Sequence, residues 1–160
     1  MDSLIVSCKQ GAITGMEHFL STLSFVPDDK LTWTPAPTAK SAIRIAAHTA
    51  LYAARFARMI REGKLPGSDG LAERWAKQAA AEVAITSRAE MESIFRKGTD
   101  EVLVALDSVP PEMIGASLDS GFGWSMPMSL LMNMPSLHAM SHAAQIDYLQ
   151  TCWGDQEVHF

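Results

Sequence analysis

The chain has 160 residues, of which 48% are apolar and 19% charged, so it can form one hydrophobic core and has no room for a second. We therefore predict a single domain over residues 1–160. The formal net charge is −5 and the 13 basic residues are scattered. This distribution argues against binding to nucleic acid, because phosphate recognition relies on clustered lysine and arginine.

The N-terminal stretch MDSLIVSCKQG has neither a basic leader nor an apolar segment long enough for a signal peptide. No uncharged apolar run reaches about 18 residues, which argues against a membrane-spanning helix. The two cysteines, Cys8 and Cys152, lie far apart and form no CxxC pair. These features indicate a cytoplasmic protein, in which we expect both thiols to be free and buried.

Helical periodicity begins near the N-terminus. Between Ser3 and Ser24, apolar residues recur every three or four positions and predict a first helix. Three prolines then interrupt the pattern in VPDDKLTWTPAPTAK, and Ser41 is a suitable N-cap for a second helix that ends near Gly63. The charge pattern of this helix predicts a solvated face that carries its arginines: Arg44, Arg55, Arg58 and Arg61.

A long connection separates the second helix from the third. From Lys64 to Thr86 the chain opens with proline and glycine, and it predicts at most a short helix around Leu71 to Ala80. The third helix is predicted from Ser87 to Asp107, because Ser87 and Glu90 have the spacing of a capping box. Gly98 is a weak point inside this helix, since glycine has a low helix propensity.

The segment DSVPPEMIGASLDSGFGWS predicts a loop, since the chain has no sustained alternation of β-branched residues and no Asn-Gly or Asp-Gly hairpin turn. The last helix is predicted from Met128 to Cys152, and Gly154 ends it. Pro135 inside this helix predicts a kink, or a helix that restarts just before His138. Four helices of about 20 residues predict an all-α four-helix bundle.

Two histidines of the last helix, His138 and His142, stand four residues apart in LHAMSHAAQIDYL and share a face with Gln145. We predict that this face points into the bundle and that the opposite face, with its smaller residues, points outward: Ser136, Ala139, Ala143, Asp147 and Gln150. On the second helix, His48 lies on an inward stripe with apolar and aromatic residues: Ile45, Tyr52, Phe56 and Met59.

Three inward imidazoles need partners, because burying each without one costs about 1–3 kcal/mol. The helical pattern shows no inward Asp or Glu that would serve, whereas a divalent metal would. His138 and His142 can chelate one ion together, and His48 would supply a third ligand that leaves coordination positions open, as in a catalytic site. The zinc-protease version of this spacing has Glu after the first histidine, and Ala139 in that place disfavours a metalloprotease.

Two other interpretations of these residues stay open. A single histidine on an apolar face is often a hydrogen-bonded core residue, and HxxxH also arises by chance in helices. The methionines near the last helix raise a copper-binding alternative, since thioethers favour Cu(I), although methionine is also a common core filler. These methionines are Met126, Met128, Met132, Met134 and Met140.

Three segments carry a resemblance to a known family: TWTPAPTAKSAIRIAAHTA, the lead-in GFGWSMPMS and HAMSHAAQIDYL. Together they resemble the DinB/YfiT-like family over the whole chain. The resemblance implies an up-down-down-up bundle in which the long connection crosses between two parallel helices. It also implies a divalent metal, namely zinc, nickel or iron, bound by His48, His138 and His142.

Family members of known activity resemble metal-dependent thiol S-transferases that use low-molecular-weight thiols, with a related mycothiol-dependent maleylpyruvate isomerase. The family commonly has Arg-Gly-Gln after the second histidine, whereas this chain has Ala143, Ala144 and Gln145. The missing arginine affects expected contacts to substrate or a partner subunit, and it leaves metal ligation unaffected.

The hypothesis from the sequence is a metal-dependent transferase of the thiol S-transferase type, or a hydrolase, that acts on a small electrophile. The alternative is a metal or small-ligand sensor of the same fold without catalysis. Gln145 is expected to hydrogen-bond a ligand's second nitrogen or a bound water, and Tyr52 to line the pocket or pack in the core. No residue is assigned as general base. The small-residue face of the last helix would permit a homodimer.

Overall fold

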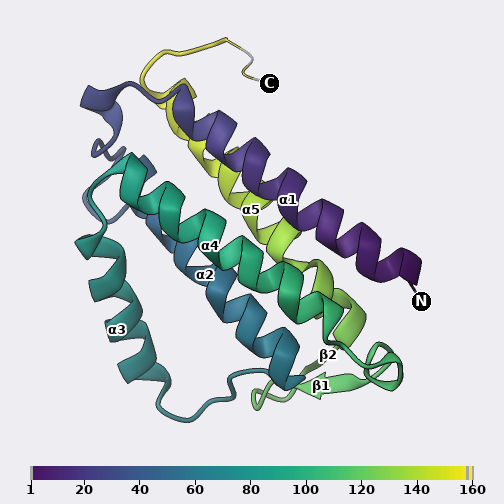
Figure 1. The fold of residues 1–160 in the computed structure, drawn as a ribbon. Helices are drawn as coiled ribbons and strands as arrows, with labels where there is room; N and C mark the ends of the chain where they lie inside the picture. The colour runs from purple at the N-terminus through teal and green to yellow at the C-terminus, as the bar shows by residue number, and fades with distance from the viewer. Residues whose placement is uncertain (1, 158, 160) are drawn as a thin grey trace.

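The structure is a computed structural model that describes residues 2–157 and 159. It contains five α-helices, two short 3-10 helices and one small hairpin (Figure 1). The α-helices are α1 (Asp2–Ser24), α2 (Ala42–Glu62), α3 (Leu71–Ala84), α4 (Arg88–Asp107) and α5 (Met128–Cys152). The remaining elements are η1 (Asp28–Lys30), η2 (Pro111–Met113), β1 (Ser117–Asp119) and β2 (Ser125–Pro127).

The four long helices form the predicted all-α bundle, with α1 and α5 running in one direction and α2 and α4 in the other (Figure 1). Side-chain contacts fix the antiparallel pairing of α1 with α4 at both ends. Lys9 forms a salt bridge of 2.6 Å with Asp107, and the guanidinium of Arg88 donates hydrogen bonds to the carbonyls of Leu23 and Val26. The described helices therefore follow one another as up, down, down, up.

Glycines allow the helices to approach closely at two crossings. A Cβ atom added at Gly98 of α4 would lie 2.8 Å from the Cβ of Ala53 on α2, and one added at Gly15 of α1 would lie 3.2 Å from the Cα of Ser136 on α5. Such spacing leaves no room for a methyl group without displacement of the neighbouring helix. Gly98, predicted to be a weak point of its helix, is thus a packing contact.

The prediction for the small-residue face of α5 was wrong. Ala139 and Ala143 are fully buried, and Gly11 and Gly15 of α1 lie against Ser136 on the same face. This face is therefore covered by α1, and it is not an outer surface that a second subunit could contact. Small residues permit close helix approach, and here the chain uses them within the bundle.

Two predictions for the connections were also wrong. The segment between α2 and α4 contains a helix as far as Ala84, longer than the short helix predicted to end at Ala80. The segment before α5, predicted as loop, contains the antiparallel hairpin β1–β2 with Leu118 opposite Met126. Its turn uses Gly121 and Gly123, with φ of 73° and 81°, so two glycines separated by a residue make a turn that has no Asn-Gly or Asp-Gly pair.

Helix α5 runs without interruption through Pro135, so the helix does not restart before His138 as the sequence had allowed. Proline removes one backbone donor, and this leaves the carbonyl of Leu131 without its usual helical partner. The thiol of Cys8 is buried, as predicted, whereas that of Cys152 is exposed, contrary to prediction. Among the described residues, no helix has the length and apolar character that a membrane crossing requires.

The buried apolar residues of the bundle form two clusters, one toward each end. Phe19, Phe95 and Ile146 belong to the first cluster, and Phe56 and Leu131 belong to the second. Between the clusters the bundle is polar in places, because α2 and α4 each carry a buried threonine there: Thr49 and Thr99. His138 of α5 lies beside this junction.

Candidate metal centre

The bundle brings together His48 of α2 with His138 and His142 of α5. One ring nitrogen of each lies within 4.8 Å of those of the other two. The Nε2 atoms of His138 and His142 are 3.1 Å apart, and the ring of His48 is centred 4.9 Å from that of His142. The rings are half-buried and not enclosed, with 19% of the His48 side chain exposed. The cluster therefore lies at the edge of the core, where a small molecule can reach it.

Hydrogen bonds to the far side of two rings orient them. The Nδ1 of His48 donates to a carboxylate oxygen of Glu82 at 2.7 Å, and the Nδ1 of His142 donates to the amide oxygen of Gln145 at 2.7 Å. A proton on Nδ1 leaves Nε2 with its lone pair, which is the form of imidazole that binds a metal. Gln145 thus contacts a histidine of the cluster.

Glu82 is the residue of this centre that sequence reasoning missed. It lies on α3 with only 3% of its side chain exposed, and it accepts hydrogen bonds from three donors: Lys40 Nζ at 2.7 Å, Gln78 Nε2 at 2.9 Å and His48 Nδ1 at 2.7 Å. Burial raises the pKa of the Glu82 carboxyl, but these hydrogen bonds outweigh burial and lower the pKa to about 2. Glu82 is therefore an ionised, inward acid, and the expectation that none would pair with the histidines was wrong.

A signal for Glu82 was present in the sequence. Leu71, Gln78 and Glu82 are spaced by seven and four residues, so they share a face of α3 if the helix continues beyond Ala80. The two buried residues on that face, Gln78 and Glu82, are polar. An apolar pattern therefore could not reveal that α3 packs against α2.

Aromatic side chains border the histidines on the α2 side. The ring of Tyr52 is centred 4.5 Å from that of His48 and is stacked on His138 at 4.9 Å. Phe56 meets His138 edge to face at 5.3 Å. Tyr52 is half-buried, so it packs on the imidazoles and also reaches the surface.

Two histidines of the cluster, His48 and His138, resist protonation. Burial, together with the nearby His142 and His48, lowers the pKa of His138 to about 3. Burial also lowers the pKa of His48, although its hydrogen bond to Glu82 acts in the opposite direction. Neutral imidazoles are the metal-binding state, so the site is ready for a cation at neutral pH.

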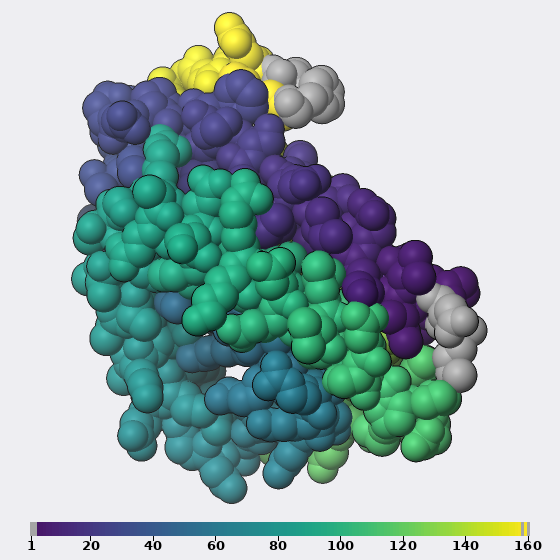
Figure 2. Space-filling view, viewed as in Figure 1, coloured from purple at the N-terminus to yellow at the C-terminus, as the bar shows by residue number. Residues whose placement is uncertain are grey.

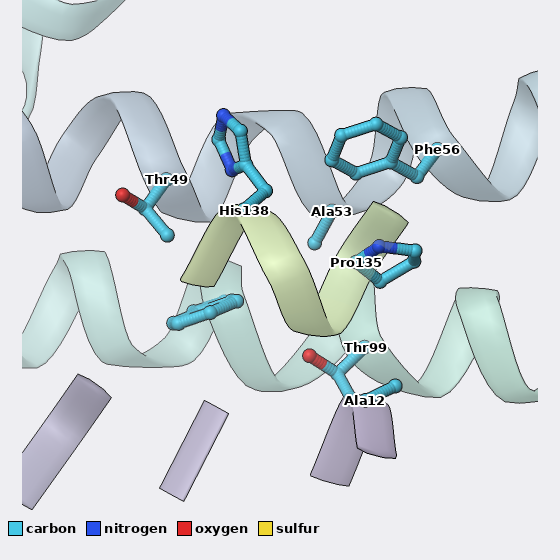
Figure 3. A pocket seen from close by; sticks show the side chains of 8 residues that line it. Ala12, Thr49, Ala53, Phe56, Thr99, Pro135 and His138 are labelled. Carbon is cyan, nitrogen blue, oxygen red and sulfur yellow. The ribbon is translucent and has the colours of Figure 1, made fainter. Parts of the chain in front are cut away.

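A small cavity of about 10 Å³ lies beneath His138, at the junction of the two core clusters. Figure 3 shows His138 projecting from α5 toward α2, with Thr49, Thr99 and Pro135 around the cavity. This volume is at the lower limit for one water molecule. The core is therefore closed below the cluster, and access is from the surface.

A larger cleft of about 490 Å³ lies along the outer side of α5. Its lining includes Lys40, Ser141, Gln145 and Tyr148, so it borders the residue that orients His142. Of the methionines considered for copper, Met128 and Met132 are fully buried in the core, whereas Met140 is 44% exposed.

The fold and the cluster define an all-α bundle with three histidines that could hold a metal ion. The chain belongs to the DinB superfamily, since the model of that family matches residues 14–146, most of its length. The resemblance inferred from the sequence is thereby confirmed.

Solved structures of low sequence identity share this fold, and two of them follow. A DinB-like protein of Bacillus subtilis is 17% identical, with a TM-score of 0.65 over 96% of each chain. The mycothiol-dependent maleylpyruvate isomerase is 15% identical, with a TM-score of 0.67 over 89% of this chain. This chain covers 60% of that isomerase. A search of curated protein sequences finds no match.

Proposed function

We propose that this chain binds a divalent metal, namely zinc, nickel or iron, through His48, His138 and His142. We also propose that it joins the sulfur of a small thiol to a carbon of a small electrophile, so that the thiol loses its proton and the electrophile loses its leaving group. The observation that carries the proposal is the convergence of three imidazoles from two helices, with ring nitrogens within 4.8 Å of one another. Two of them are held by hydrogen bonds to Glu82 and Gln145.

The donor set suits a divalent transition metal. Two nitrogens on one tetrahedral zinc lie roughly 3.3 Å apart, given bonds of about 2.0–2.1 Å, and the Nε2 atoms of His138 and His142 are 3.1 Å apart. Ligand histidines usually donate their other N–H to a carboxylate or another acceptor. His48 and His142 both make such a bond.

Three protein ligands leave room for a small molecule at the metal. A bound divalent metal supplies a Lewis acid, which lowers the pKa of a thiol and so makes sulfur a nucleophile at neutral pH. Glu82 adds a negative charge behind His48, and Lys40 neutralises part of it. The cleft beside Gln145 has room for the electrophile, and Tyr52 shields the other side of the imidazoles.

Metal content tests the proposal directly. We expect the purified protein to hold about one equivalent of metal by elemental analysis, and His48→Ala, His138→Ala and His142→Ala each to lose it. The matched control is His18→Ala, which removes a half-buried histidine of α1 outside the cluster and should keep the metal. Unchanged metal content in all three cluster variants would contradict the site.

Thiol transfer is tested on the metal-loaded protein with one electrophile, 1-chloro-2,4-dinitrobenzene, and a panel of small thiols. The expected result is thioether formation that a chelator abolishes and that His142→Ala lacks. A protein that holds stoichiometric metal yet leaves every thiol unreacted would instead support the non-catalytic metal-binding alternative.

A further inference from the structure

A second cleft, of about 350 Å³, lies between α2, α3 and the β1–β2 hairpin. Figure 2 shows the molecule hollowed between α3 and the C-terminal half of α2. The volume is within the usual range for sites of small molecules. Nothing in the metal centre proposed above uses this cleft, but the two share one wall, Tyr52.

The charged residues that line this cleft are all cationic. Arg55 and Arg58 come from α2, and Arg74 and Lys77 come from α3. Arg74 is occupied, since its guanidinium donates to the carbonyls of the α2–α3 connection. Within residues 2–157 and 159, no salt bridge engages the other three cations. Like charges gathered around one cavity repel one another, and an anion in the cavity would relieve that repulsion.

Aromatic side chains stand at the same cleft with much of their surface in water. Trp75 is 63% exposed and Phe122 is 49% exposed, and both line the cavity together with Tyr52. The guanidinium carbon of Arg55 lies 5.0 Å from the centre of the Tyr52 ring. Exposed aromatic surface next to unpaired cations suits a ligand that is planar and anionic, because rings stack on its body and guanidinium groups bind its charge.

The walls of the cleft are built by specific backbone contacts. A Cβ atom at Gly121 would lie 3.2 Å from the Cα of Gly67, and both glycines have positive φ, of 73° and 64°. The hairpin turn therefore touches the α2–α3 connection backbone to backbone, which places Phe122 over the cavity. Arg74 holds the other side of that connection through Pro66, Gly67 and Asp69.

We propose that this cleft binds a planar small molecule with two negatively charged groups, of the aromatic dicarboxylate type. Its charges lie at Arg55, Arg58 and Lys77, and its ring lies against Tyr52 and Trp75. Since Tyr52 also packs on His48 and His138, the ligand is placed beside the histidine cluster. A ligand beside the histidine cluster could serve as a co-substrate of the metal centre. That role rests on the proposed function, whereas the binding of the anion does not.

The test is a titration with isophthalate, followed by the indole ¹H–¹⁵N resonances of the tryptophans, with Trp75→Phe to assign the relevant signal. We expect the Trp75 resonance to shift. The resonances of Trp33 and Trp153, which pack edge to face away from the cleft, should stay in place. Isophthalamide, the neutral analogue of the same shape, should cause no shift.

Arg55→Gln with Arg58→Gln should weaken isophthalate binding at least about tenfold, the effect of losing charge-assisted hydrogen bonds. The matched control is Arg61→Gln with Lys97→Gln, which removes two exposed charges outside the cleft lining and should change the Kd less than about twofold. Unchanged Trp33 and Trp153 resonances report that each variant is folded. The proposal is overturned if the Trp75 resonance does not shift with isophthalate, or if isophthalamide binds as tightly as isophthalate. It is also overturned if the control variant loses as much affinity for isophthalate as Arg55→Gln with Arg58→Gln.

The same titration on metal-free protein and on His142→Ala separates this proposal from the proposed function. If both bind isophthalate with the Kd of the untreated protein, the anion site in the cleft is supported even when elemental analysis finds no metal. Stoichiometric metal with no shift of Trp75 leaves the metal centre in place and overturns the cleft alone.

Discussion

The long helices and the connections between them are held together in different ways. At the crossings of α1 with α5 and of α2 with α4, glycines bring backbones into near contact, and the buried residues around them are mostly apolar. Helix α3 of the α2–α4 connection is held by polar groups, since the residues buried within it are Gln78 and Glu82. The bundle therefore positions the imidazoles. The connection with α3 supplies the negative charge of Glu82 beside His48 and part of the walls of the cationic cleft.

The largest expected effect is at the close crossing of α2 with α4. Gly98→Val should lower the free energy of unfolding by about 2–3 kcal/mol, because its side chain has no space against Ala53 and Ala54. Urea denaturation measures the change. The control in a connection is Gly115→Ala, whose Cβ would meet nothing within 4 Å, and we expect a change below about 0.5 kcal/mol. Equal stability of both variants would contradict the comparison.

The contribution of the α3 connection to the metal centre is tested by Glu82→Ala. Loss of the carboxylate behind His48 should weaken metal affinity by about 10–100-fold, measured by competition with a chelator. Glu73→Ala, an exposed acid in the first turn of the same helix, should leave the affinity unchanged. Gln145→Ala should have a smaller effect than Glu82→Ala, since Gln145 is exposed and uncharged.

A pH titration of stability tests the buried imidazoles in metal-free protein. The folded-state pKa of His138 is about 3, below its ordinary value of 6.5, so the unfolded chain binds a proton that the folded protein does not. The contribution of His138 is therefore fully present above pH 6.5 and is lost as the pH falls, by about 1.4 kcal/mol per pH unit. From pH 6.5 to pH 5 we expect a loss of about 2 kcal/mol.

The window above pH 5 isolates the histidines, because the stabilisation by Glu82 changes with pH only below that window. Its folded-state pKa is about 2, below the ordinary 4.5, so its own stabilisation is lost as the pH falls below 4.5. His138→Gln should flatten the pH dependence between pH 6.5 and pH 5, as followed by thermal melting. An equally steep dependence in this variant would mean that other groups cause it.

The smallest expected effect is at the surface. Asp107→Asn removes the salt bridge with Lys9, whose partners are 59% and 31% exposed, and should cost less than about 1 kcal/mol. A double-mutant cycle with Lys9→Gln measures the coupling, which should decrease with added salt. A coupling well above this value would show that the ends of α1 and α4 depend on charge as α3 does.

The sequence by itself determined the helices of the bundle and the helix faces on which His48, His138 and His142 lie. Helical periodicity, a serine N-cap and a capping box are local signals, and they located α1, α2, α4 and α5 within a few residues. The spacing of His138 and His142 and the stripe that carries His48 depend only on helix geometry. The family resemblance, which the family match confirms, strengthened the expectation from helix geometry that these three residues form one site.

The tertiary structure decided what surrounds the histidines and which side of α5 is covered. Glu82 looks like a solvated charge in the sequence, because a polar face of a helix has no apolar pattern to mark its burial. Likewise, the small residues of α5 were read as an outer face, although Ala139 and Ala143 pack against α1. Both errors have one physical reason: local periodicity gives the direction of a side chain, and only packing between distant segments decides whether a neighbour is there to meet it.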